Sequence, residues 1–349
     1  MPPCDEISKN EGKEMERGRN DVIIKAINLR KYFPIKLGFI KSLLVKQVPL
    51  VRAVDGISFE IKRKEVFGLV GESGCGKTTT GRILVGLIPP TTGKIYFDGN
   101  DLTALTYEEL QRLRARMQII FQDPYESLNP RMSIYDIVTE PLRLQKEEHS
   151  EEEIYERACR VLESVGLVPP EEFLFRFPHE VSGGQRQRVA IARAFIVEPK
   201  FIVADEPVSM LDASIRSEVA RLMLKLIEEF NVSYLYITHD IALARYMCNR
   251  ISVMYLGKIV EEGPSEDIIK HPLHPYTEAL LAAVPVPDPT ARRTEIVIKG
   301  EVPSPINPPP GCRFHTRCPY AKEKCKKEEP QLMEISKNRF VACHFPLEN

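Results

Sequence analysis

The pattern of apolar and polar positions predicts a domain in which strands and helices alternate. Strand-like runs begin with VIIKAINL from Val22, GISFEI from Gly56 and EVFGLVG from Glu65. Later runs of the same kind are IYFD (95–98), FIVAD (201–205), VSYLYIT (232–238) and ISVMYLGKIV (251–260). Helical spacing of apolar residues recurs over 77–87, 107–117, 133–166, from about 184, 213–229 and 241–247. This alternation favours an α/β domain with a substantially parallel sheet.

Four stretches set the expected domain boundaries and subdomains. Residues 1–20 are charged throughout and are expected to form a disordered tail, so the main domain spans 21–284. Residues from about 123 to 185 are expected to form a helical subdomain within it. The apolar and basic stretch between Phe33 and Ala53 is interpreted as a hairpin extension. Residues 285–310 contain eight prolines, so 285–349 is expected to be a linker and a small Cys-rich domain.

Charge and hydropathy exclude several classes of function. The 349 residues include 48 Lys and Arg against 49 Asp and Glu, a net charge of −1, which argues against a dedicated nucleic-acid-binding protein. The chain contains no apolar run of the roughly 18 residues that a membrane span requires. Its first residues also lack the apolar core of a signal peptide. We therefore expect a cytosolic protein whose role at a membrane depends on partners.

The sequence GESGCGKT (71–78) fits the phosphate-binding pattern G-x-x-x-x-G-K-[ST] in full. It follows an apolar strand and precedes a helix, as the motif requires, and its glycines allow backbone N–H groups to face a phosphate. Lys77 supplies a cation, and the Thr78 hydroxyl is a ligand for Mg²⁺. Cys75 lies at a helix N-terminus, which can lower the pKa of a thiol. The predicted nucleotide contacts in this segment are Gly71, Glu72, Ser73, Gly74, Cys75, Gly76, Lys77, Thr78 and Thr79.

The strand FIVAD supplies the acidic partner of this loop. Asp205 ends a buried apolar strand, where it can hold Mg²⁺ through a water. Glu206 lies one residue further on, where a carboxylate can orient and activate the water that attacks a phosphate. The sequence therefore predicts nucleotide hydrolysis with Mg²⁺.

The segment VSGGQRQRVAIARA (181–194) resembles the signature motif of the ATP-binding subunits of ABC transporters, and with the two motifs above it identifies the family. The resemblance implies a P-loop NTPase core with a RecA-like parallel sheet, an antiparallel β subdomain, a helical subdomain and here a Cys-rich extension. It further implies that two chains enclose two ATP molecules. The signature residues that would contact the partner's nucleotide are Ser182, Gly183, Gly184 and Gln185.

Further positions match the family residue by residue. The resemblance implies that Gln122 reaches Mg²⁺ and water, and that His239 contacts the γ-phosphate. SMLD (209–212) resembles the D-loop, ending at Asp212, with Met210 where alanine is commoner. An aromatic residue near 32–33 should stack on adenine, with Phe33 favoured by its spacing over Tyr32. Glu206, His239 and Gln122 are therefore the predicted catalytic residues.

Three longer stretches resemble the dipeptide and oligopeptide permease subgroup: FPHEVSGGQRQR, LHPYTEALL and PPPGCRFHTRCPY. The implied assembly pairs this chain head to tail with a paralogous ATP-binding subunit, or with itself in isolation. Two membrane permease subunits and an extracytoplasmic substrate-binding protein complete it. The chain would lie at the cytoplasmic face of the membrane, without nucleic acid. An oligosaccharide importer is the alternative cargo, and a soluble ABC ATPase with a regulatory iron–sulfur module is the alternative class.

Four cysteines near the C-terminus have the spacing C-x₅-C-x₆-C-x₁₇-C: Cys312, Cys318, Cys325 and Cys343. Zinc sites usually pair cysteines at shorter spacing, and disulfides are disfavoured in the cytosol. Four thiolates can hold an iron–sulfur cluster, and the subgroup resemblance points to [4Fe–4S]. Zinc, with His315 or His344 as a substitute ligand, and plain reduced thiols stay open as alternatives.

Overall fold

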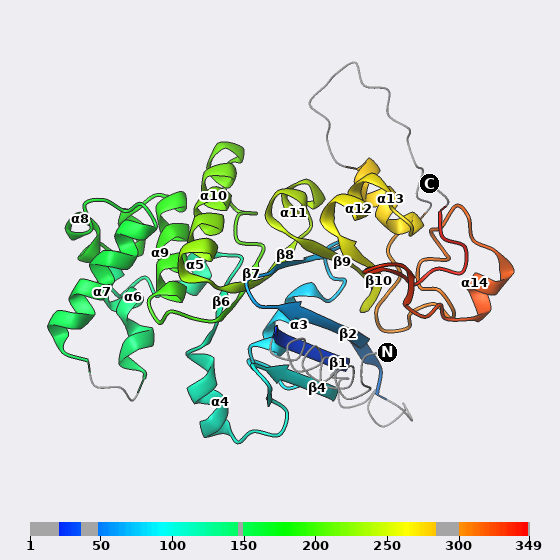
Figure 1. Cartoon of the computed structure of the whole chain (residues 1–349), viewed down its shortest axis with the longest axis horizontal. Helices are drawn as coiled ribbons and strands as arrows, with labels where there is room; N and C mark the ends of the chain where they lie inside the picture. The colour runs from blue at the N-terminus through cyan, green and yellow to red at the C-terminus, as the bar shows by residue number, and fades with distance from the viewer. Residues whose placement is uncertain (1–20, 36–47, 146–148, 284–299, 348–349) are drawn as a thin grey trace, which may run out of the picture.

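Two β-sheets and the helices around them make up the structure, a computed structural model that describes residues 21–35, 48–145, 149–283 and 300–347 (Figure 1). The predicted tail 1–20 lies outside the described residues, as do most of the predicted hairpin extension and much of the Pro-rich linker. The ends of that hairpin are described. Pro34 pairs with Leu50, and the amide of Ile35 donates to the Pro49 carbonyl at 3.0 Å.

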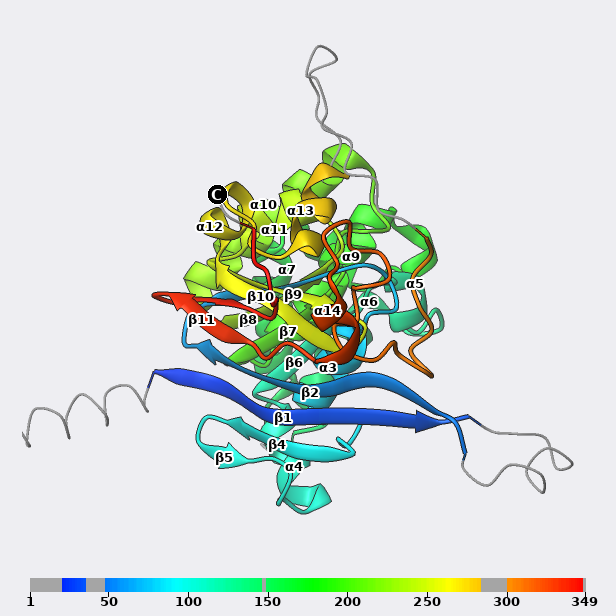
Figure 2. The ribbon, with the colours of Figure 1, turned by 90° about the vertical axis from the view of Figure 1, so that its right-hand side faces the viewer.

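The smaller sheet is antiparallel and has the strand order β2-β1-β4-β5. Its strands are β1 (Val22–Pro34), β2 (Leu50–Lys62), β4 (Thr92–Phe97) and β5 (Asn100–Asp101). Alternate residues such as Ile24, Phe59 and Ile61 are buried because one face of the sheet packs on the rest of the protein. Figure 2 shows this sheet beneath the larger one, and its presence confirms the predicted antiparallel part.

The larger sheet has the order β11-β12-β10-β9-β3-β8-β7-β6. Five of its strands run parallel: β3 (Val66–Val70), β6 (Met117–Ile120), β7 (Phe201–Asp205), β8 (Ser233–Thr238) and β9 (Arg250–Tyr255). Every residue of β3, β7 and β8 is buried, which explains their unbroken apolar runs. The remaining strands pair antiparallel: β10 (Lys258–Pro264), β11 (Met333–Ser336) and β12 (Arg339–Val341).

The helices are distributed over three regions of the molecule. Figure 1 shows one group at the end of the molecule opposite the C-terminal segment: α5 (Pro124–Ser127), α6 (Ile134–Arg143), α7 (Glu151–Ser164), α8 (Glu171–Leu174) and α9 (Gly183–Phe195). The central helices are α3 (Lys77–Leu84), α4 (Tyr107–Arg114), α10 (Ala213–Phe230) and α11 (Ile241–Met247). The last group is α12 (Ser265–Lys270), α13 (Pro275–Ala282) and α14 (Glu323–Lys327).

The helical stretch predicted over 133–166 forms two helices rather than one. Ser133 and Ser150 each accept a hydrogen bond from the backbone N–H three residues later, so each begins a separate helix. The stretch between α7 and α9 contains the short helix α8, followed by a 3₁₀ turn at Pro178–Glu180. The segment from about 123 to 185 is therefore helical for much of its described length.

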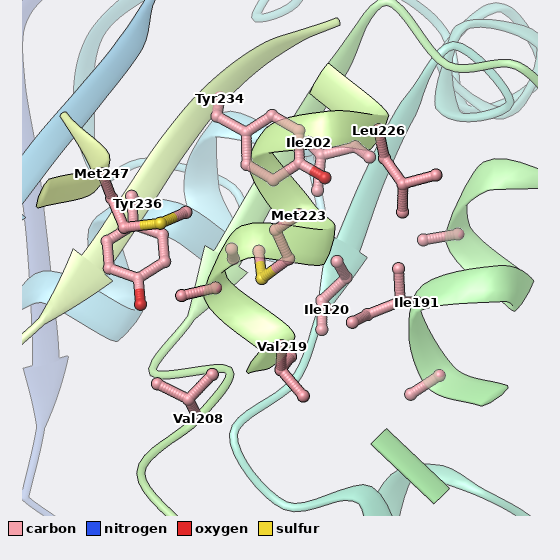
Figure 3. Close-up of a cluster of buried hydrophobic side chains, with 14 of the residues drawn as sticks. Ile120, Ile191, Ile202, Val208, Val219, Met223, Leu226, Tyr234, Tyr236 and Met247 are labelled. Atoms are coloured by element: carbon pink, nitrogen blue, oxygen red, sulfur yellow. The ribbon is translucent and has the colours of Figure 1, made fainter. Parts of the chain in front are cut away.

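A large apolar core lies between the larger sheet and the helices on one of its faces. Figure 3 shows side chains of β6, β7 and β8 turned toward α9 and α10, so that sheet and helices share one buried cluster. The labelled members of this cluster are Ile120, Ile191, Ile202, Val208, Val219, Met223, Leu226, Tyr234, Tyr236 and Met247. A second cluster joins both sheets with α3 and fixes the helix that follows the phosphate-binding motif.

The C-terminal segment is built into the main sheet, which the sequence analysis did not predict. Strand β12 pairs with β10, where Val341 faces Glu261, and β11 pairs with β12 at the sheet edge. The composition of 285–349 indicates a separate extension. The structure instead places part of this extension in the same sheet as the phosphate-binding strand β3.

Candidate nucleotide-binding site and cysteine cluster

The loop between β3 and α3 has the backbone geometry of a phosphate-binding loop. Gly74 and Gly76 have φ values of 78° and 111°, which favour glycine. A Cβ on Gly76 would lie 2.1 Å from the Ala53 carbonyl oxygen, so no side chain fits there. Helix α3 begins at Lys77 and directs its first N–H groups into the loop, where they favour an anion.

Lys77 is the cation of this loop. Its Nζ donates to the carbonyl oxygens of Gly71 at 2.7 Å and Glu72 at 3.0 Å, and lies 4.0 Å from Oε1 of Glu206. The side chain is only 4% exposed, so its charge acts in a weakly screened environment. The ammonium group therefore joins the loop to the acidic end of β7.

Thr78 and Asp205 meet as the sequence predicts for a Mg²⁺ site. The Thr78 hydroxyl donates to Oδ1 of Asp205 at 3.0 Å. The pKa of the Asp205 carboxyl is raised above its ordinary value. Burial is the main cause and nearby Glu206 adds to it, while the Thr78 hydrogen bond acts in the opposite direction. A hydroxyl and a carboxylate are hard oxygen donors of the kind Mg²⁺ prefers, so the donor set fits this ion.

Glu206 is the point at which the predicted catalytic side chains converge. Nε2 of Gln122 donates to its Oε2 at 3.2 Å, and Nδ1 of His239 lies 2.9 Å from the same oxygen. Gln122 follows β6, Glu206 follows β7, His239 follows β8 and the phosphate loop follows β3. These four strands are neighbours in the order β3-β8-β7-β6, so their carboxyl ends bring the residues together.

The backbone of Glu206 is held in an unusual conformation. Its φ is +47°, in the left-handed region that side chains other than glycine rarely adopt. Its amide donates to the Ile237 carbonyl at 2.9 Å, and its own carbonyl accepts from the Ser209 hydroxyl at 3.0 Å. These bonds hold the carboxylate toward Gln122 and His239. Backbone strain of this kind occurs at functional sites.

A pocket of about 800 Å³ lies over these residues. Phe33 lines it and is 38% exposed. Tyr32, the alternative aromatic, instead donates its hydroxyl to Oδ1 of Asp55 at 2.5 Å. The predicted residues that line the pocket are Phe33, Glu72, Ser73, Gly74, Gly76, Lys77, Thr78, Thr79, Gln122, Glu206 and His239.

Several predicted contacts do not line this pocket. Gly71 and Cys75 are buried members of the loop itself, and Asp205 accepts a hydrogen bond from Thr78. The expectation that the helix N-terminus lowers the pKa of Cys75 is wrong, because burial of the thiol raises it. The signature residues and Asp212 also lie elsewhere: Ser182, Gly183, Gly184 and Gln185 begin α9, and Asp212 precedes α10.

The signature residues form a tightly bonded helix start. The Ser182 hydroxyl accepts the Gln185 amide at 3.3 Å, while Oε1 of Gln185 accepts the Ser182 amide at 2.9 Å. This reciprocal arrangement is a capping box, and it leaves the first N–H groups of α9 available to an incoming anion.

The sequence analysis gave no nucleotide-binding role to several pocket residues that lie outside the nucleotide-binding motifs. Leu280 and Ala283, at the end of α13, line the pocket, and so does Pro305 of the C-terminal segment. Val51 and Ala53 of β2 complete this set. Leu280 belongs to the subgroup stretch LHPYTEALL, but no nucleotide-binding pattern marks any of these positions, because they reach the pocket only through the packing of distant elements.

The four predicted cluster cysteines, Cys312, Cys318, Cys325 and Cys343, surround one small cavity. The amides of Phe314, Tyr320 and Phe345 each hydrogen-bond the cysteine sulfur two residues before them. His315 and His344 line the same cavity.

All cysteines of the described residues are free thiols. Within residues 21–35, 48–145, 149–283 and 300–347, no three His, Cys, Asp or Glu side chains adopt an arrangement that could hold a metal ion. The iron–sulfur cluster stays a prediction.

In the described part of the chain, no helix is both long and apolar enough to cross a membrane.

Comparisons with known proteins agree with this geometry. A family model described as ABC transporter matches residues 54–209, and one described as oligopeptide/dipeptide transporter, C-terminal region, matches residues 260–325. The oligopeptide transport ATP-binding protein AppF of Bacillus subtilis (strain 168) is 47% identical over 333 residues, covering 95% of this chain and 99% of AppF.

Solved structures of ATP-binding cassettes also superpose on the chain. The dimeric cassette MJ0796, in a post-hydrolysis state bound to ADP and Pi, is 31% identical, with a TM-score of 0.61 over 70% of this chain and 99% of that one. CbiO1 from Clostridium perfringens, part of the transporter complex cbiONQ, is 28% identical, with a TM-score of 0.60 over 72% of this chain and 92% of that one.

The chain therefore belongs to the ATP-binding proteins of ABC transporters. Within this family, the match to the C-terminal region and the relation to AppF assign it to the oligopeptide/dipeptide subgroup. The resemblance and the fold predicted from the motifs are both confirmed.

Proposed function

We propose that this chain is the ATP-hydrolysing subunit of an oligopeptide importer, at the cytoplasmic face of the cell membrane. The observation that supports this most directly is the convergence of Gln122, His239 and Lys77 on Glu206, beside the Thr78–Asp205 pair. The name of the relative AppF supports the peptide cargo.

Each residue of the site then has a defined task. The loop amides and Lys77 would bind the phosphates, and Thr78 and Asp205 would hold Mg²⁺, which would neutralise charge on the phosphates. Glu206 orients the attacking water and accepts its proton, and His239 and Gln122 hold the Glu206 carboxylate in place. The signature residues at the start of α9 would complete the site of a second subunit, either a paralogue or another copy of this chain.

Phe33 is the proposed platform for adenine. Its ring lines the pocket, whereas Tyr32 is bonded to Asp55. Phe33→Ala should weaken ATP binding about tenfold, the scale of stacking on an aromatic ring. Tyr32→Phe is the matched control, because it keeps a ring and removes only the hydroxyl. If Tyr32→Ala weakens ATP binding more than Phe33→Ala does, the assignment is wrong.

A second pocket of about 800 Å³ is the place where we propose that a membrane permease subunit contacts this chain. It lies among α4, β6, α6 and α9, directly beside the Gln122 loop. Leu144, 79% exposed, is at its rim, and Arg193 and Glu140 form an ion pair at 3.0 Å in its wall. A segment of the permease seated here would contact the residues that lead to Gln122.

The cargo and the assembly are tested by reconstitution. The chain, its paralogous subunit, the two permeases and the binding protein are placed in vesicles, and ATP-driven uptake of peptides and oligosaccharides is measured. Uptake of peptides that is lost with Glu206→Gln supports the proposal. Uptake of oligosaccharides alone would change the cargo, and ATP hydrolysis with no membrane partner would favour the soluble ATPase.

We further propose that Cys312, Cys318, Cys325 and Cys343 hold a [4Fe–4S] cluster, supported by their convergence on one cavity and by the N–H groups that face their sulfurs. Protein purified without oxygen should contain iron and sulfide, and it should absorb light at about 400 nm, the usual region for such clusters. Replacing Cys318 and Cys325 by serine should remove this absorbance. Stoichiometric zinc, or metal-free protein, would exclude the cluster.

A further inference from the structure

Arg317, in the Cys-rich segment, reaches across to the phosphate-binding loop. Its Nη1 and Nη2 donate to the two carboxylate oxygens of Glu72 at 2.8 and 3.1 Å. The arginine is 8% exposed, and the Glu72 side chain is 27% exposed. A paired, fork-like contact of this kind fixes the position of the carboxylate as well as its charge.

An aromatic cluster holds the guanidinium group of Arg317. Its central carbon lies 5.8 Å from the ring centre of Tyr255 and 5.9 Å from that of Phe314, within the range of a cation–π contact. Tyr276 packs on both rings, with centroid distances of 4.6 Å to Tyr255 and 5.3 Å to Phe314. The side chain is therefore fixed before any ligand arrives.

Glu72 is held on three sides. Its amide donates to the Tyr276 hydroxyl at 2.9 Å, its carbonyl accepts from Lys77 at 3.0 Å, and its carboxylate is bound by Arg317. Glu72 also lines the pocket in which the phosphates would bind. An unpaired carboxylate at this point would repel a polyphosphate, and the effect is strong where water is partly excluded.

We propose that Arg317 is a positioning residue for nucleotide binding, which neutralises and orients Glu72 so that the loop accepts a polyphosphate. The proposal rests on the assignment of the pocket to ATP and is independent of what the four cysteines hold. Through Arg317, the C-terminal segment then acts directly on the nucleotide site, because Glu72 is the second residue of the phosphate-binding loop.

The alternative is that Arg317 only attaches the segment to the core. Arg339 is the matched control for that role. It is 5% exposed, comes from the same segment and pairs at 2.8 Å with Glu261, which does not line the nucleotide pocket. Arg339→Met should lower the unfolding temperature, but the folded protein should bind ATP as wild type does.

The test measures binding of ATP, ADP and AMP with Mg²⁺ by calorimetry on the full chain. Arg317→Met should weaken ATP binding about tenfold, with a smaller loss for ADP and the smallest for AMP, because repulsion grows with phosphate charge. Arg317→Lys should retain most of the affinity. Glu72→Gln should bind ATP more tightly than wild type, since it leaves the positive charge of Arg317 uncompensated. The double variant Glu72→Gln with Arg317→Met should bind ATP with near wild-type affinity, because both charges are removed.

Equal losses for ATP and AMP in Arg317→Met, without rescue by Glu72→Gln, would mean that the arginine is only a structural support. Should Arg317→Met fail to fold, Glu72→Gln alone decides, and unchanged or weaker ATP binding overturns the proposal. Wild-type protein that binds no ATP would instead refute the assignment of the pocket, a result that is distinct from the failure of this inference.

Discussion

Replacement of Glu206 by Gln tests the site at its centre. The amide has the shape of the carboxylate, so the contacts with Gln122 at 3.2 Å and His239 at 2.9 Å can persist while the negative charge and the basicity are lost. A positioned general base contributes about 10² to 10⁴ in rate, or about 3–5 kcal/mol of activation free energy. We expect hydrolysis to fall by that factor.

ATP binding should survive the same change. The change removes the negative charge that lies 4.0 Å from Nζ of Lys77 and would compete with a phosphate for it. It also removes one of the charges that raise the pKa of Asp205. Single-turnover hydrolysis and equilibrium ATP binding are measured side by side. Glu266→Gln, which removes an exposed partner of Arg245, is the control and should hydrolyse ATP as wild type does. Wild-type turnover by Glu206→Gln, with ATP bound, would refute the reasoning.

Three further predictions concern buried groups. Cys75 should resist maleimide at pH 7–8 in the folded protein, because burial raises its thiol pKa; rapid labelling, measured by mass, would contradict this. Glu262→Gln should flatten the pH dependence of stability: burial raises the pKa of Glu262 from 4.5 to about 7, so its contribution is full below pH 4.5 and is lost as pH rises through 7. Tyr234→Phe should raise the unfolding free energy by about 1 kcal/mol in urea titrations, because no described residue bonds the buried hydroxyl.

Motifs that combine a strand end with a loop could be read from the sequence. The phosphate loop, Asp205 and Glu206 lie where strand–loop patterns predict them, because each strand is a continuous apolar run that a polar residue ends. The meeting of Gln122 and His239 at Glu206 follows from the strand order β3-β8-β7-β6, whereas the resemblance supplied only the identity of these residues. The sequence alone gives no order for strands separated by a helical insertion.

Other features depend on tertiary contacts that leave no local pattern. Strand β6 (Met117–Ile120) follows helix α4 closely, without an intervening glycine or proline, so the predicted helix extends to Met117 and the short strand is missed. The pKa of Cys75 depends on the burial of its thiol, which outweighs the effect of the helix N-terminus. The position of Pro305 in the pocket wall depends on how the C-terminal segment folds back.

The attachment of the C-terminal segment to the core changes the meaning of its unusual composition. A proline-rich, cysteine-rich stretch suggests an independent module, yet three of its arginines pair with carboxylates of the main domain, and two of these pairs, those of Arg313 and Arg339, are buried on both sides. The pairs are Arg313 with Asp55, Arg317 with Glu72 and Arg339 with Glu261. Breaking a buried pair from one side costs about 3–5 kcal/mol, because the remaining charge is left uncompensated. Removal of the segment would leave these carboxylates of the main domain without their arginine partners, so it should lower the unfolding free energy of the main domain.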